Sequence, residues 1–94
     1  WSIVKSGVAA DKLLPKDAIV IAPYGGDTAF LYQINRRGFP YLYMPEKDLR
    51  DLYNAQYYVS VNYDNDTNRI MNKYTVLERT SEYVIVKLEE PVSP

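Results

Sequence analysis

Two reactive residue types are missing from this chain of 94 residues, which contains no cysteine and no histidine. Their absence excludes thiol nucleophiles, disulfide bonds, Ser-His catalytic arrangements and the usual ligand sets for zinc and haem. Any catalysis would have to use Asp, Glu, Lys, Tyr or a bound metal. No carboxylate stands alone in the apolar setting that makes a general acid, so we predict no catalytic residue, no metal site and no cofactor.

The lack of long apolar runs and of excess positive charge excludes further classes of protein. No apolar run approaches the roughly 20 residues that a membrane span needs, and the N-terminus lacks the charged-then-apolar order of a signal peptide. The 11 Lys and Arg nearly balance the 12 Asp and Glu, so there is no basic footprint for nucleic acid. We expect residues 1–94 to form a single domain with one modest core. Because the chain begins at Trp1 rather than Met, we expect it to be part of a longer protein.

The spacing of apolar residues predicts an α/β fold. Helices are expected over residues 2–13, from Asp27 or Thr28 to Arg37, and over 45–55; strands are expected over 18–22, 41–43, 57–61, 73–79 and 82–89. The strand 18–22 (AIVIA) is apolar on both faces, which is typical of the centre of a parallel sheet. The order of elements predicts a mainly parallel, Rossmann-like sheet of three βα-linked strands, with helices on its faces. The last two strands should form an antiparallel hairpin at one edge.

Local signals predict helix ends and buried faces. Asp27 or Thr28 should cap the second helix, Arg36 and Arg37 should lie in its last turn, and Gly38 should follow that turn. The expected buried faces are Phe30, Leu31 and Ile34 in the second helix and Leu49, Leu52 and Tyr53 in the third.

The turn after the first strand raises the question of phosphate binding. Gly25-Gly26-Asp27-Thr28 has neither the G-x-G-x-x-G spacing of a dinucleotide fingerprint nor the lysine of a P-loop. Asp27 would also put a carboxylate where a phosphate should sit, which favours a structural turn. Six tyrosines near the strand ends stand where parallel sheets bind ligands, although such tyrosines more commonly close the end of a small core. They are Tyr24, Tyr32, Tyr41, Tyr43, Tyr57 and Tyr58. The residues predicted to contact a ligand are Tyr24, Gly25, Gly26, Asp27 and Tyr43.

Residues 62–69 (NYDNDTNR) are expected to form a polar loop between strands. The stretch from Asp64 to Asn68 matches the first half of a calcium-binding loop. Arg69 then stands where that loop needs Gly, and Thr75 stands where it needs a bidentate Glu, so an EF-hand is excluded. Asn65-Asp66-Thr67 is also a formal N-glycosylation sequon, which has meaning only in a secreted eukaryotic protein.

The segment LLPKDAIVIAPYGGDTAFLYQINRRGFP (13–40) resembles the soluble C-terminal region of multi-spanning membrane glycosyltransferases related to protein O-mannosyltransferases and aminoarabinose transferases. The resemblance is carried, in chain order, by Pro15-Lys16-Asp17, the apolar strand 18–22, Gly26-Asp27, Leu31-Tyr32 and Arg36-Arg37-Gly38-Phe39. The strand YYVSV and a hairpin ending in YVIVKLEE also fit, so the resemblance covers most of the chain.

The resemblance implies a parent enzyme that moves a sugar from a polyprenyl-phosphate carrier to an acceptor outside the cytoplasm. The essential acidic residue of that family lies in an early loop between membrane helices, which is not in this sequence. The chain is then expected to be a non-catalytic extracytoplasmic domain that packs on the membrane-embedded remainder of the parent or contacts a saccharide or acceptor. The alternative is a stand-alone α/β module that binds a small ligand or peptide.

Overall fold

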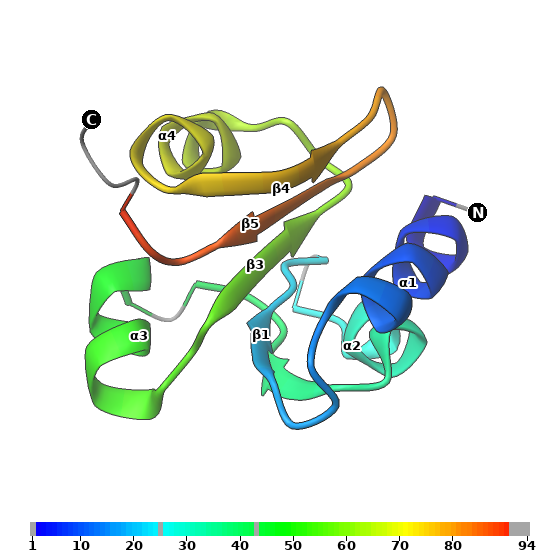
Figure 1. Cartoon of the computed structure of the whole chain (residues 1–94), viewed down its shortest axis with the longest axis horizontal. Coiled ribbons are helices and arrows are strands. Elements are labelled where there is room, and N and C mark those ends of the chain that lie inside the picture. Colours follow the sequence, from blue (N-terminus) through cyan, green and yellow to red (C-terminus); the bar gives the residue numbers. More distant parts are fainter. Residues whose placement is uncertain (1, 25, 43, 91–94) are drawn as a thin grey trace.

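The computed structural model describes residues 2–24, 26–42 and 44–90, which form an α/β fold (Figure 1). The elements in chain order are α1 (Ser2–Leu13), β1 (Ile19–Ile21), α2 (Ala29–Ile34), β2 (Arg37–Phe39), α3 (Glu46–Tyr53), β3 (Tyr57–Ser60), α4 (Asn65–Lys73), β4 (Thr75–Arg79) and β5 (Val84–Lys87). In this part of the chain, no helix combines the length and the apolarity that crossing a bilayer requires.

The strands form one five-stranded sheet in the order β2-β1-β3-β5-β4. β1 pairs in parallel with both β2 and β3, whereas β5 pairs antiparallel with β3 and β4. β1 therefore lies in the middle of the parallel part, and the β4–β5 hairpin forms the other side of the sheet, as predicted. Two of the four strand pairings are antiparallel, so the sheet is mixed. The predicted α/β fold is confirmed, whereas the Rossmann-like arrangement is not.

Helices cover both faces of the sheet, and the strands supply side chains to each face in alternation. Val20, Val59 and Ile85 pack with residues of α1 and α2 on one face. Ile21 and Tyr58, each adjacent in sequence to one of these, pack with residues of α3 and α4 on the other face. Figure 1 shows the same division, with α1 and α2 at one side of the sheet and α3 and α4 at the other.

The predicted end of the second helix is wrong, and so is the strand predicted after it. α2 ends at Ile34 because Asn35 takes the left-handed conformation, with φ of 61° and ψ of 43°. The chain re-enters the sheet at Arg37, so Gly38 lies in β2 instead of following a helix. A side chain at Gly38 would not fit, since its Cβ would lie 1.7 Å from the carbonyl oxygen of Val20 in the neighbouring strand.

The polar loop predicted over 62–69 is also wrong, because most of this segment belongs to α4. Asp64 is the N-cap, and its Oδ1 accepts a hydrogen bond of 2.9 Å from the backbone N–H of Thr67. Thr67 and Ile70, three residues apart, are fully buried against the sheet. The polar residues that indicated a loop therefore form the N-terminus of α4.

The buried face predicted for the third helix is correct for Leu49 alone. Leu52 and Tyr53 are 70% and 52% exposed. The second buried position of α3 is Glu46, a charged residue that apolar spacing could not identify. Tyr53 instead packs its ring edge-on against Phe39 of β2, with 5.9 Å between the ring centroids.

Candidate functional site

The carboxyl ends of β1, β2 and β3 meet at one edge of the sheet. After β1 the chain enters α2 on one face of the sheet, and after β3 it enters α4 on the opposite face. Connections that leave adjacent parallel strands in opposite directions open a crevice between them, where α/β proteins commonly bind ligands. This edge is therefore the first place to examine for a site.

Two adjoining cavities occupy this edge, and together we call them the strand-end groove. The smaller one, of about 180 Å³, is lined by Pro23, Tyr41, Leu42, Tyr58, Asp64 and Asp66. The larger one, of about 440 Å³, is lined by Leu42, Met44, Pro45, Asp66 and Arg69. Leu42 and Asp66 belong to both cavities, so the groove is continuous from the end of β1 to the start of α3.

Tyr41 supplies an aromatic wall, and the backbone of Gly26 supports it. Gly26 has a φ of +80°, which side chains rarely tolerate, and an added Cβ would lie 3.3 Å from Cδ1 of the Tyr41 ring. The absence of a side chain at Gly26 thus lets the Tyr41 ring lie against the turn that follows β1. Tyr41 is nevertheless 47% exposed, so part of its ring faces solvent.

Tyr58, which lines the smaller cavity, belongs to a chain of buried hydroxyl groups. Thr67 Oγ1 donates to Ser60 Oγ at 3.1 Å, and Ser60 Oγ donates to the carbonyl of Asn62 at 2.8 Å. Because each hydroxyl has one proton, Tyr58 must be the donor in its 2.9 Å bond with Thr67. Burial, with a smaller contribution from Asp64, raises the pKa of Tyr58 to about 12. Tyr58 is therefore a neutral, fixed donor that anchors α4 to β3.

Acidic side chains form the rim where α4 begins. Asp64 and Asp66 are both exposed, and Asp64 also caps the helix. Arg69, which lines the larger cavity, is already paired: its Nη1 lies 2.6 Å from Glu46 Oε1, and its Nη2 lies 3.6 Å from Asp66 Oδ1. The rim thus offers free acceptor capacity and little positive charge.

Glu46 holds Arg69 in place from beneath the groove. Its side chain is 2% exposed and accepts hydrogen bonds from Arg69 and, at 2.9 Å, from the Tyr74 hydroxyl. Burial raises the pKa of Glu46, but the hydrogen bonds from Arg69 and Tyr74 outweigh it and leave the pKa below its ordinary value. Glu46 is therefore a charged structural residue that joins α3 to α4.

Tyr24, Gly26 and Asp27, three of the five residues predicted to contact a ligand, lie at this same end of the sheet. The Asp27 carboxylate accepts a 2.8 Å hydrogen bond from the Ala29 N–H at the start of α2, whereas Thr28 occupies the cap position without a side-chain bond. Tyr24 packs edge-on against Phe30, and Gly26 supports Tyr41. Gly25 and Tyr43 lie outside the described residues. Ligand contact by these five residues stays a prediction.

Sequence reasoning placed Tyr41 among the tyrosines near strand ends but not among the predicted ligand contacts. It missed Asp64 and Asp66 as groove residues, because it placed 62–69 in a loop. A usable signal was present, since all three closely follow the carboxyl ends of strands that pair with β1. Within residues 2–24, 26–42 and 44–90, no group of three or more acidic side chains could hold a metal ion.

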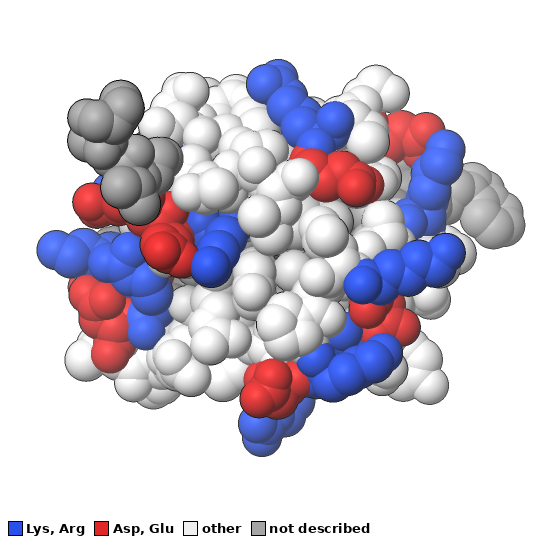
Figure 2. Space-filling model, in the orientation of Figure 1, with Lys and Arg blue, Asp and Glu red and all other residues white. Residues whose placement is uncertain are grey.

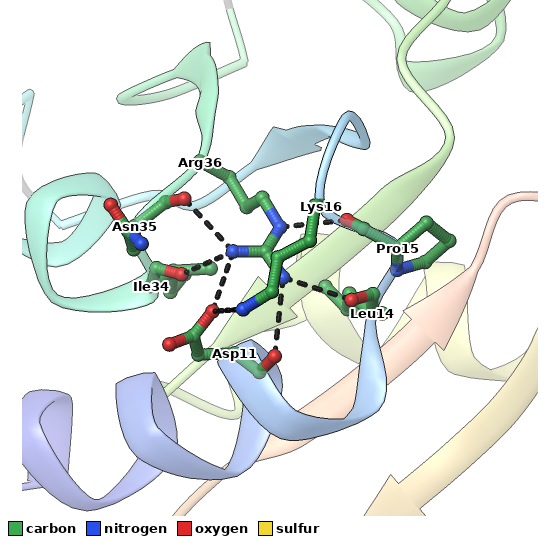
Figure 3. Close-up of polar contacts among 7 residues, drawn as sticks. All are labelled: Asp11, Leu14, Pro15, Lys16, Ile34, Asn35 and Arg36. Atoms are coloured by element: carbon green, nitrogen blue, oxygen red, sulfur yellow. Dashed lines mark hydrogen bonds and ion pairs between the residues drawn. The ribbon is translucent and has the colours of Figure 1, made fainter.

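A third cavity, of about 300 Å³, lies beside Arg36 near the start of β1, and its chemistry is structural. The Arg36 side chain is 1% exposed, and its five N–H groups are all used (Figure 3). They donate to the Asp11 carboxylate at 2.6 Å and to the carbonyls of Asp11, Leu14, Pro15, Ile34 and Asn35. One guanidinium therefore binds the carboxyl ends of both α1 and α2 and has no donor left for a ligand.

On the face drawn in Figure 2, acidic and basic side chains lie next to one another around the edge and leave the middle uncharged. This face carries no patch of a single sign that would favour nucleic acid. Comparisons of the chain with protein-family models, with curated proteins and with solved structures gave no match.

Proposed function

We propose that this chain is a non-catalytic, extracytoplasmic domain of a membrane glycosyltransferase that uses a polyprenyl-phosphate sugar as donor. In this proposal the domain packs on the membrane-embedded part of the parent and aids acceptor binding. The sequence resemblance over residues 13–40 is its starting point.

The observation that carries the proposal is that the residues of the resemblance are fold determinants. Asp27 accepts a hydrogen bond from the first N–H of α2, Arg36 binds the ends of two helices, and Gly38 lies where a side chain would strike β1. A pattern of such residues is what a family preserving this domain would keep. The buried charges Arg36 and Glu46 are fully engaged in holding helices, which supports a domain whose contribution is to bind and pack.

The proposal is tested by glycosyl transfer from a polyprenyl-phosphate sugar, measured with the isolated chain and with full-length parent proteins. We expect no turnover by the isolated chain. In the parent, Arg36→Met should destabilise the domain and lower acceptor use above the melting temperature of the variant domain, while the neighbouring exposed Arg37→Met should leave transfer unchanged. Turnover by the isolated chain, or full transfer in the Arg36→Met parent once the domain is shown to be unfolded, would contradict the proposal.

The strand-end groove favours a second candidate, a stand-alone module that binds a small ligand or peptide at the strand ends. The sequence that precedes Trp1 in the gene separates the two candidates. Several apolar stretches of about 20 residues would support the membrane enzyme. A soluble upstream domain would support the stand-alone module.

A further inference from the structure

We propose that the strand-end groove is a saccharide-binding site, in which a sugar ring lies against Tyr41 and donates hydroxyl hydrogen bonds to Asp64 and Asp66. The inference deepens the proposed function, on which it rests for the source of the ligand, an acceptor glycan or the sugar of a donor. It names the class of ligand for a groove at the carboxyl ends of parallel strands.

The size of the groove suits one or two sugar rings. Its larger cavity, of about 440 Å³, falls within the range of about 300–1,000 Å³ that is usual for small-molecule sites. The smaller cavity of about 180 Å³ continues it toward Tyr58. The groove is open along the sheet edge, so a longer glycan could extend beyond it.

The lining has the two-sided chemistry that a sugar presents. A pyranose ring has a C–H face, which packs on apolar and aromatic surface, and a rim of hydroxyl groups. The lining of the groove combines Tyr41, Leu42 and Met44 with two acidic residues, Asp64 and Asp66. Carboxylate acceptors form hydrogen bonds about twice as strong as neutral ones, which suits hydroxyl donors.

The charge of the rim excludes anionic ligands. Two carboxylates face the groove, and Arg69 is already bound to Glu46 at 2.6 Å. A phosphate, nucleotide or acidic peptide would meet repulsion from the start of α4 and would gain no available cation. The lining thus favours a donor-rich ligand without negative charge, and a neutral sugar is such a molecule.

The groove is held in shape before a ligand arrives. The Tyr41 ring rests on Gly26, and α4 is fixed by the Asp64 cap and by the Tyr58–Thr67 hydrogen bond. A site that is already ordered loses less conformational freedom on binding. Ordering matters here because single sugars have few contacts to offset that loss.

The test is an NMR titration of the 94-residue chain with the methyl glycosides of mannose, glucose and galactose. We expect saturable shifts centred on the amides of residues 41–42 and 64–66, with a dissociation constant for at least one glycoside in the millimolar range or below, about 4 kcal/mol. Inorganic phosphate and tetramethylammonium are the anionic and cationic comparison probes and should give no saturable shifts there.

Variants with matched controls assign the binding to the groove. Tyr41→Ala and Asp66→Ala should each weaken binding by about tenfold or more, which corresponds to about 1.4 kcal/mol. As controls, Tyr32→Ala removes an exposed tyrosine of α2, and Asp48→Ala removes an exposed Asp from the first turn of α3. Both control variants should bind the glycoside as tightly as the unmodified chain. Thermal unfolding of each variant checks that the fold is intact.

The inference is overturned if no glycoside saturates the groove, if phosphate or tetramethylammonium binds there instead, or if the control variants weaken binding as much as the groove variants. Failure here leaves the proposed function standing, because the transfer assay with Arg36→Met does not depend on a saccharide in the groove. Conversely, if the chain binds a saccharide but its gene encodes no membrane segment, the proposed function fails and the saccharide site stands.

Discussion

Replacing Arg36 by Met should remove more stability than any other exchange of a charged residue for an apolar one of similar length in this chain. The guanidinium is 1% exposed and donates to one carboxylate and five carbonyls, all near the carboxyl ends of α1 and α2. Met keeps the aliphatic part of the side chain and removes every donor, so these acceptors lose their partner while packing changes little.

The expected loss is about 3–5 kcal/mol, because Met leaves the buried carbonyls of Leu14 and Ile34 without a donor and each unsatisfied buried group costs about 1–3 kcal/mol. A domain of this size has a total stability of about 5–15 kcal/mol, so the variant would be marginal. Its melting temperature should fall by about 12 °C or more, at about 4 °C or more for each kcal/mol. Lys at this position keeps the charge opposite Asp11 but has one compact donor group, so Arg36→Lys should fall between Met and the parent chain.

The assay is urea unfolding followed by circular dichroism, with the stability read from the midpoint at constant slope. Arg37→Met is the matched control, because Arg37 is the next residue and is exposed; it should change stability by at most about 0.5 kcal/mol. A loss below about 1 kcal/mol in Arg36→Met, equal to that of Arg37→Met, would refute the structural role of the buried guanidinium.

Three further predictions concern the sheet, the turn and the acid limb. Ile21→Ala should lower the free energy of unfolding in urea by about 2–5 kcal/mol, because Ile21 is fully buried. Ile19→Ala should lower it by less, because Ile19 is half-buried; equally small losses for both variants would contradict a central β1. Gly26→Ala should cost about 1–2 kcal/mol, since Gly26 has positive φ, and shift the NMR signals of Tyr41; an unchanged midpoint would mean that the turn relaxes freely. The pKa of Glu46 lies below its ordinary 4.5, so the stability that Glu46 contributes is complete above that pH and is lost as the pH falls through its folded-state pKa. Glu46→Gln should therefore reduce the loss of stability at acid pH, measured by urea unfolding at several pH values. An unchanged pH dependence would contradict a stabilising role for the Glu46 carboxylate.

Much of the architecture follows from patterns that are local in the chain. The all-apolar run 18–22 identified the strand at the middle of the parallel part, and residues 2–13 were identified as a helix with the same bounds as α1. The hairpin at one side of the sheet was likewise predictable, because two β-rich segments flank a short polar turn.

The errors arise where a polar residue performs a structural task. Asn35 ends α2 in a conformation more usual for Gly, which moved the predicted strand four residues too late. Asp64 starts a helix in a segment whose composition indicates a loop, and Glu46 occupies a buried position. Arg36 was expected to serve one helix through its charge, whereas it bonds to two. Side-chain partners far apart in the sequence decide each case, and spacing alone does not reveal them.

The location of the groove was predictable from the sequence, but not all of the residues that line it were. Strand ends were the expected place for a ligand, and Tyr24, Gly26 and Asp27 do lie there. Tyr41 was among the tyrosines expected near strand ends but not among the predicted contacts, and Asp66 entered the site only once α4 had its actual bounds.

On each face of the sheet, a buried ion joins the two helices: Arg36 joins α1 to α2, and Glu46 joins α3 to α4 through Arg69. Neither helix of a pair can open without exposing the ion that the other also binds. The backbone amides at the carboxyl ends of α1 and α2 should therefore exchange with solvent deuterium through a shared opening, and those at the junction of α3 and α4 through a second one. Local opening of this protein would thus proceed by layers of paired helices and not by single helices.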